Sequence, residues 1–429
     1  MLIQRFRRAA RGGLACAALL AAGITAASAS GQAPSNIEVG TLYASSGAFA
    51  AISMPAYQGL KLWAHQVNAE GGVFVKPYGK RIPVKLVAYD DLSSTSTATT
   101  LYNQLISQDK VDILVADAGS VLTSVAVPLA REHGMLLFNQ SGTGDKLFSA
   151  ANRYDVLLDD PVSSLWPARL VDFLTEVAPQ HHIRRVAILY STNDFTGAQA
   201  EALRQDLAAA KARSGVSVVY DQGVPTSTTN YFVLLHQIQA AHPDAVIEMG
   251  YPGNDVAFLK ALHQSGMKFG MVFAIYPGLE TQLLLKSAGA DALRGVFTYV
   301  PATGVHYQAR FGMDIDQFAQ AYRSMYGDDV DVGFNAVAGY NTGLVIQKAL
   351  GSTASMDQMA LRDAVFALSG KLHTLDGEFR LAADGAQLGE VMPIGQLQPD
   401  ARGLSLVPVY PPAVAKARPM LAPAPAPVH

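Results

Sequence analysis

Residues 111–145 constrain the fold more than any other part of the chain, because two buried-type strands flank one helix-length segment there. Residues 111–116 form a nearly unbroken apolar run, which is typical of a strand covered on both faces. An apolar-periodic segment follows at 121–132 and stops before Gly134, a residue type that favours helix ends. Pro128 within it predicts a kink or a late helix start. A second apolar run at 135–138 completes a βαβ unit, which predicts a parallel sheet.

Both strands of this unit end in loops rich in glycine and hydroxyl groups. Gly119 permits a tight turn and Ser120 can cap the helix, while the second loop carries Ser141 and Thr143. Open α/β sheets bind ligands at the carboxyl ends of their strands, and loop amides and helix N-termini there favour an anion. We therefore expect a ligand carboxylate between Ser120 and the Ser141/Thr143 loop. The alternative, that these hydroxyls only cap helices, agrees equally well with the loop chemistry.

The same alternation of strands and helices continues along most of the chain. Residues 37–43 predict a first strand, whose loop carries Ser46, and a helix is expected from about Pro55. Strands are predicted at 186–190, 216–220, 245–249 and 271–275, with helices between them. This pattern predicts an α/β fold with two doubly wound, parallel-sheet lobes.

Extended segments at 153–158, 295–300 and 377–381 are expected to cross between the lobes. We assign residues 36–156 and 301–373 to the first lobe, and residues 157–300 and 374–410 to the second. Residues 411–429 are rich in proline and alanine, so we expect a disordered or polyproline-like tail.

The N-terminus has the pattern of a secretory signal peptide. Four arginines within residues 5–11 precede an apolar stretch at 12–26 and a small-residue cleavage pattern at 27–29. The apolar stretch is shorter than the roughly 20 residues that span a bilayer, which disfavours the alternative of a retained anchor. We expect residues 1–29 to be removed, slightly later cleavage being the alternative, and the mature protein to be periplasmic. The single cysteine, Cys16, lies within this segment.

The net charge and the sequence motifs exclude several classes of function. The formal net charge is −3, and removing the four arginines gives −3 − 4 = −7, with no basic stripe for nucleic acid. No P-loop, dinucleotide fingerprint, nucleophile elbow or zinc-protease motif follows a strand. His181 and His182 could bind a metal, but adjacent histidines on a polar turn are usually solvated. We expect no metal, no cofactor and no catalysis.

Taken in order, several short motifs resemble the Leu/Ile/Val-binding periplasmic proteins. The resemblance extends from about residue 36 to about residue 400, and it depends on the order and spacing of motifs that are individually unspecific. These motifs are the Val39-Gly40 strand with Ser46-Gly47, the stretch Asn68-Ala69-Glu70-Gly71-Gly72, Tyr89-Asp90-Asp91, residues 126–130 with Gly134, the Ser141-Gly142-Thr143 loop, the strand 186–190, and Pro243-Asp244-Ala245-Val246.

The resemblance implies a type I periplasmic binding protein fold, with two lobes joined by three crossovers. Its function would be that of a solute receptor for an ABC importer, with a small-molecule ligand and a permease of the inner membrane as partners; we expect a monomer. The carboxylate-holding positions of the family match Ser120 and the Ser141/Thr143 loop. The complete set of ligand-binding residues that we expect is Ser46, Gly119, Ser120, Ser141, Thr143, Phe195, Tyr251 and Tyr276.

The sequence departs from the family where an acid should hold the ammonium of an amino acid. That position falls near Pro277, and Glu280 is close but out of register. A buried ammonium without a carboxylate is unfavourable, so a small carboxylate or another polar organic solute fits better than a standard amino acid. If an amino acid is bound, Glu280 or Glu248 is the candidate partner. The alternative functions are a signalling receptor of the same fold and an exported hydrolase that uses Ser120 or Ser141.

Overall fold

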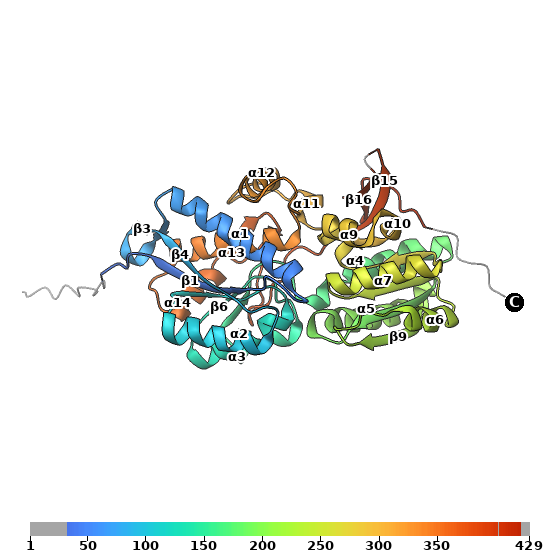
Figure 1. Cartoon of the computed structure of the whole chain (residues 1–429), viewed down its shortest axis with the longest axis horizontal. Helices are drawn as coiled ribbons and strands as arrows, with labels where there is room; N and C mark the ends of the chain where they lie inside the picture. Colours follow the sequence, from blue (N-terminus) through green and yellow to red (C-terminus); the bar gives the residue numbers. More distant parts are fainter. Residues whose placement is uncertain (1–31, 402, 422–429) are drawn as a thin grey trace, which may run out of the picture. The chain divides into compact units, whose positions relative to one another are not determined.

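The computed structural model describes residues 32–401 and 403–421. The predicted signal peptide therefore lies outside the described residues, as do residues 422–429. Within the described part, the chain forms two main sheets, each flanked by helices (Figure 1). We call the elements around the five-stranded sheet the first lobe and those around the seven-stranded sheet the second lobe.

The first sheet is entirely parallel, in the order β4-β1-β5-β6-β7. Its central strands are buried on both faces, as the unbroken apolar runs predicted. The strands are β1 (Ile37–Tyr43), β4 (Val84–Asp90), β5 (Ile113–Val115), β6 (Leu137–Asn139) and β7 (Asp155–Leu157). A small hairpin joins β2 (Val73–Val75) to β3 (Lys80–Ile82).

Six helices accompany this sheet. They are α1 (Ala50–Ala69), α2 (Thr95–Gln104), α3 (Ser120–His133), α12 (Ile315–Tyr326), α13 (Phe334–Ser352) and α14 (Gln358–Phe366). Helices α1 and α13 lie side by side although they are far apart in sequence (Figure 1). A Cβ atom at Gly339 of α13 would lie 1.8 Å from the carbonyl oxygen of Ala56, and one at Gly59 of α1 would lie 2.0 Å from that of Ala336. The two backbones therefore touch where the helices cross.

The second sheet has the order β16-β15-β12-β11-β10-β8-β9. Strands β8 to β12 are parallel, whereas β15 and β16 form an antiparallel hairpin at one edge. The strands are β8 (Arg185–Ser191), β9 (Ser217–Val224), β10 (Ala245–Met249), β11 (Met271–Phe273), β12 (Phe297–Tyr299), β15 (Ile394–Asp400) and β16 (Gly403–Tyr410). Its helices are α4 (Ala168–Asp172), α5 (Asp194–Ser214), α6 (Phe232–Ala240), α7 (Pro252–Ser265), α8 (Tyr276–Leu279), α9 (Thr281–Ala288), α10 (Ala290–Leu293) and α11 (Ala302–Val305).

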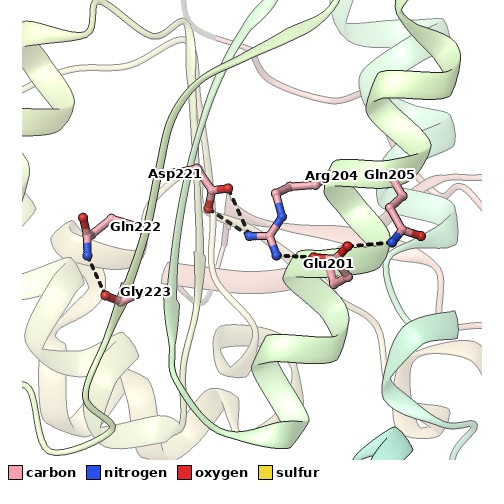
Figure 2. Close-up of polar contacts among 6 residues, drawn as sticks. All are labelled: Glu201, Arg204, Gln205, Asp221, Gln222 and Gly223. Carbon is pink, nitrogen blue, oxygen red and sulfur yellow. Dashed lines mark hydrogen bonds and ion pairs between the residues drawn. The ribbon is translucent and has the colours of Figure 1, made fainter.

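A polar cluster ties the edge strand β9 to helix α5 (Figure 2). Nη1 of Arg204 lies 3.0 Å from each carboxylate oxygen of Asp221, and its Nη2 donates to Glu201 on the preceding helical turn. Gln205 donates to the other oxygen of Glu201 at 2.6 Å. The cluster aligns the edge strand with α5. Because these side chains are partly exposed, it adds little to the free energy of unfolding.

The structure corrects the predicted start of one helix and excludes a late start for another. Helix α1 begins at Ala50, ahead of Pro55, because Phe49 and Ile52 are buried in the core and draw the preceding turn into the helix. Helix α3 begins at Ser120, so Pro128 does not delay its start.

Two segments also differ from the predicted outline. Strand β7, within the segment predicted to cross, pairs in parallel with β6, so the chain leaves the first sheet only after Leu157. The expected disordered tail is packed as far as Leu421: the side-chain amide of Gln396 bonds both the N–H and the carbonyl oxygen of Met420, at 2.8 and 2.7 Å.

None of the helices within 32–401 and 403–421 combines the length and the apolar character that crossing a membrane requires.

Candidate functional site

The loops after β5 and β6 are held together by hydrogen bonds from backbone to hydroxyl groups. The N–H of Gly119 donates to Oγ of Ser141 at 3.2 Å, and the N–H of Gly144 donates to Oγ of Ser120 at 2.9 Å. Ser120 is the first residue of α3, so it links the two loops and does not cap the helix as predicted. Each hydroxyl accepts one bond and retains its own proton for a further partner.

Gly119 has a left-handed backbone, with φ of 82°, as the predicted tight turn requires. A Cβ atom there would lie 2.8 Å from Cδ1 of Ile52 and 3.4 Å from Oη of Tyr251. The glycine therefore lets Tyr251, at the start of α7 in the second lobe, approach the N-terminus of α3.

Ten buried residues from both lobes line one small cavity. The space among them is about 10 Å³, roughly the room that one water molecule needs. They are Ile52, Gly119, Ser120, Ser141, Phe334 and Asn335 of the first lobe, and Trp166, Phe195, Tyr251 and Tyr276 of the second. Six of the eight residues predicted from the sequence are among them.

The other two predicted residues lie elsewhere. Thr143 is buried, but its hydroxyl pairs with that of Ser163 at 2.9 Å, outside the lining. Ser46 is exposed, and its carbonyl oxygen accepts a hydrogen bond from Ser93. Thr143 can therefore support the loop from behind, whereas Ser46 lies away from the cavity.

Five of the ten lining residues are aromatic. The ring of Trp166 meets the edge or face of Phe195 and Phe334, with centroids 5.1 and 5.8 Å apart. Tyr251 contacts Phe195 at 5.4 Å and Tyr276 at 6.4 Å. Flat faces at such spacings suit an apolar or aromatic ligand body.

The polar end of the cavity lies at the N-terminus of α3. The Tyr251 hydroxyl is buried and faces the backbone N–H groups of Ser120 and Val121 without reaching hydrogen-bond geometry. Burial raises the pKa of Tyr251, so its hydroxyl stays protonated. Helix N–H groups and free hydroxyl protons together favour an anionic ligand group.

The lining contains no acidic or basic side chain among the residues that the structure describes. No imidazole, amine or carboxylate lies against the Ser120 or Ser141 hydroxyl in the hydrogen bonds of these loops. An activated serine nucleophile needs such a base. In the described residues, the hydrogen-bond partners of both hydroxyls are backbone N–H groups.

A buried glutamate lies directly behind the lining. Oε1 of Glu280, at the start of α9, accepts the side-chain N–H of Asn335 at 2.7 Å and its backbone N–H at 3.4 Å. Burial, and then the charge of Asp331, raise the pKa of Glu280 to about 8. Asp331, which precedes α13, in turn accepts from the N–H groups of Gln282 and Leu283 at 3.0 and 3.2 Å. The first turns of α9 and α13 are thus joined by two carboxyl groups.

Two further groups of buried acids lie outside the lining. In the first group, Oδ2 of Asp255 accepts the N–H of Tyr276 at 2.6 Å, which fixes the backbone under one wall of the cavity. Asp255 lies beside the buried Glu248, and burial raises the pKa of Asp255 to about 7. The second group consists of Asp159, Asp160 and Asp376, and it lies where the chain passes between the lobes. One carboxyl oxygen of each lies within 4.8 Å of those of the other two, which is close enough to hold a metal ion. The amide of Asn341 donates into this group.

Comparison with known proteins identifies the family of this chain. The family model described as periplasmic binding protein matches residues 36–402. The chain belongs to the periplasmic binding protein family. The Leu/Ile/Val-binding protein homolog 7 of Brucella abortus (strain 2308) is 23% identical to it over 350 residues, which are 80% of this chain and 84% of that protein.

Other proteins that share the fold of this periplasmic binding protein have been solved in complex with different ligands. A branched-chain amino acid transporter substrate-binding protein from Streptococcus pneumoniae, in complex with isoleucine, superposes with a TM-score of 0.70 at 18% identity, covering 87% of this chain and 99% of that one. An ABC transporter solute-binding protein from R. palustris, in complex with benzoate, gives 0.68 at 19% identity, covering 87% and 96%. These likenesses establish the type I fold that the sequence predicted.

Four lining residues are missing from the predicted set. Ile52 lies in the first turn of α1, Trp166 follows the first passage between lobes, and Phe334 and Asn335 form the first turn of α13. None lies in the loop directly after a parallel strand, which was the place searched. The signal that could have found the last two is Gly333, since a helix that starts after a glycine with no side-chain cap leaves N–H groups for other partners.

Proposed function

We propose that this protein is the substrate-binding component of an ABC importer and captures a small organic solute that carries a carboxylate and no ammonium. It would pass the solute to a permease of the inner membrane without changing it chemically. Family membership supports the transport role, and the cavity lining supports the ligand class.

The observation that carries the ligand class is the lining itself. Two hydroxyls with free protons and the N–H groups of α3 offer donors to a carboxylate, while no ionised acid faces the cavity to pair with an ammonium. Glu280 is near, but Asn335 occupies its Oε1 and burial favours its neutral form. An ammonium there would remain poorly paired, which is costly in a buried site. The benzoate complex of the R. palustris protein shows that this fold accommodates such a ligand.

Binding would require the two lobes to separate. The cavity has room for about one water molecule, whereas any organic acid is several times larger, and both lobes contribute walls. A ligand that touches both lobes stabilises the form in which they meet around it.

We expect small aromatic or aliphatic acids to raise the melting temperature more than leucine, isoleucine or valine does. A ligand at 100 times its dissociation constant adds about 2.7 kcal/mol to the free energy of unfolding. A thermal-shift screen of both groups at equal concentration measures the difference. If leucine or valine gives the largest shift, the inferred ligand class is wrong and the ammonium partner is Glu280 or Glu248.

Ser120→Ala is expected to weaken binding of the acid found in that screen by about 1–3 kcal/mol, because a donor to the carboxylate and the bond from Gly144 are both lost. Ser124→Ala is the matched control: it lies on the same helix, is exposed and bonds only the carbonyl of Val121. Isothermal titration calorimetry compares the two. Equal affinities in both variants would show that the carboxylate does not lie at the N-terminus of α3.

A further inference from the structure

Asn335 lines the cavity and carries an unused hydrogen-bond acceptor. It is 2% exposed and lines the cavity through the first turn of α13. Its Nδ2 donates to Oε1 of Glu280, which does not line the cavity, and its Oδ1 has no hydrogen bond within the described residues. The amide oxygen is therefore the polar atom of this side chain left for a ligand.

The orientation of this amide is fixed by its neighbour. Oε1 of Glu280 also accepts the backbone N–H of Asn335, and a backbone N–H can only donate. With the carboxyl proton on Oε2, Oε1 is the carbonyl oxygen and accepts both N–H groups, so the side-chain group that faces it is the amide NH₂. With Oε1 as the carbonyl oxygen, rotating the amide by 180° would set two acceptors against each other. Glu280 consequently acts as a positioning residue for Oδ1.

The cavity wall therefore offers both donors and an acceptor. Donors come from Ser120, Ser141 and the N–H groups of α3, and the acceptor, Oδ1 of Asn335, comes from the start of α13. Aromatic rings such as those of Trp166 and Phe195 lie in the same wall. A matching ligand has a carboxylate, a flat apolar body and a neutral donor.

We propose that Asn335 selects acids whose ring carries a hydroxyl group, by accepting the hydrogen bond of that hydroxyl on Oδ1. This inference rests on the proposed function, since it assumes that the carboxylate is held at α3. A buried amide oxygen left unpaired by a ligand without the hydroxyl costs binding free energy, which makes the contact selective.

The test compares benzoate with its three monohydroxy isomers by isothermal titration calorimetry. For the unmodified protein we expect at least one isomer to bind about 10-fold or more tightly than benzoate. In Asn335→Leu this preference, measured as the ratio of the dissociation constants of benzoate and the hydroxylated isomer, should vanish. In Glu280→Gln the preference should persist, because the glutamine carbonyl can accept the same two N–H groups.

The outcomes separate this inference from the proposed function. If benzoate and its isomers bind the unmodified protein equally, the role of Asn335 is wrong although the carboxylate site stands. If a hydroxylated isomer is preferred and Asn335→Leu retains the preference, another acceptor is responsible and the inference fails. If none of the four acids binds, the inference falls together with the ligand class. Asn335→Ser, which is smaller and polar, should lower the preference too, and it replaces Asn335→Leu if that variant does not fold.

Discussion

Raising the pH from 5 to 8 is expected to lower the melting temperature by at least about 5 °C, because several carboxyl groups are buried in their protonated form. Burial raises the pKa of Asp160 and Glu280 to about 8 and that of Asp255 to about 7, from ordinary values of 3.8, 4.5 and 3.8. The unfolded chain releases these protons near pH 4, whereas the folded protein keeps them until about pH 7–8. Between these limits the folded state binds more protons, so its stability falls as the pH rises, by up to about 1.4 kcal/mol per pH unit for each group.

A single buried acid can be separated from the overall charge of the protein. Asp155 lies on β7 and is fully buried, and within the described part of the chain neither of its carboxyl oxygens has a hydrogen bond; burial raises its pKa well above the ordinary value. Asp155→Asn should therefore reduce the loss of stability between pH 5 and pH 8. Asp206→Asn makes the same change of charge on the exposed face of α5 and should leave the loss unaltered. Thermal unfolding followed by circular dichroism gives both values, and a melting temperature that is equal or higher at pH 8 would contradict the argument.

Gly339→Ala is expected to destabilise the protein by about 1–3 kcal/mol or more, through a single methyl group. That methyl would lie 1.8 Å from the carbonyl oxygen of Ala56, so α1 and α13 would have to separate where their backbones touch. The displacement would also reach the first turn of α13, where Asn335 lies.

The control for this prediction is the same substitution on the same helix. A Cβ atom at Gly351 has no neighbour nearer than the carbonyl oxygen of Phe74, at 3.9 Å. Gly351→Ala should therefore be neutral or raise stability by up to about 1 kcal/mol, since alanine favours helix more than glycine does. Denaturant unfolding of the two variants measures the difference, and equal stabilities would show that the helices do not cross in contact.

The sequence predicted the parts of the site that follow parallel strands. Ser120 and Ser141 stand at the ends of two buried apolar runs, and parallel strands bring such ends to one edge of a sheet. Tyr251 and Tyr276 follow β10 and β11 in the same way. The periodicity of the strands, which is local information, therefore places each pair at the edge of its own sheet.

The remaining parts depend on contacts between segments far apart in the chain. Nothing local to Asn335 indicates that the start of α13 faces the strand ends, because α13 is positioned by its crossing with α1. Glu280 appeared out of register as an ammonium partner, and the structure places it behind Asn335. The early start of α1, ahead of Pro55, likewise follows from burial of Phe49 and Ile52, which overrides the local preference of proline.

The position of the tryptophans gives this protein a built-in optical reporter. It has only two: Trp166 lies in the cavity wall among aromatic rings, whereas Trp63 is buried between α1 and α13, with its indole N–H bonded to Gln347. A ligand that enters the cavity changes the surroundings of the first indole and leaves those of the second as they are. Trp63→Phe would therefore leave a protein whose ultraviolet emission comes from one tryptophan, at the cavity, so that uptake of a solute could be followed in real time without a dye or a label.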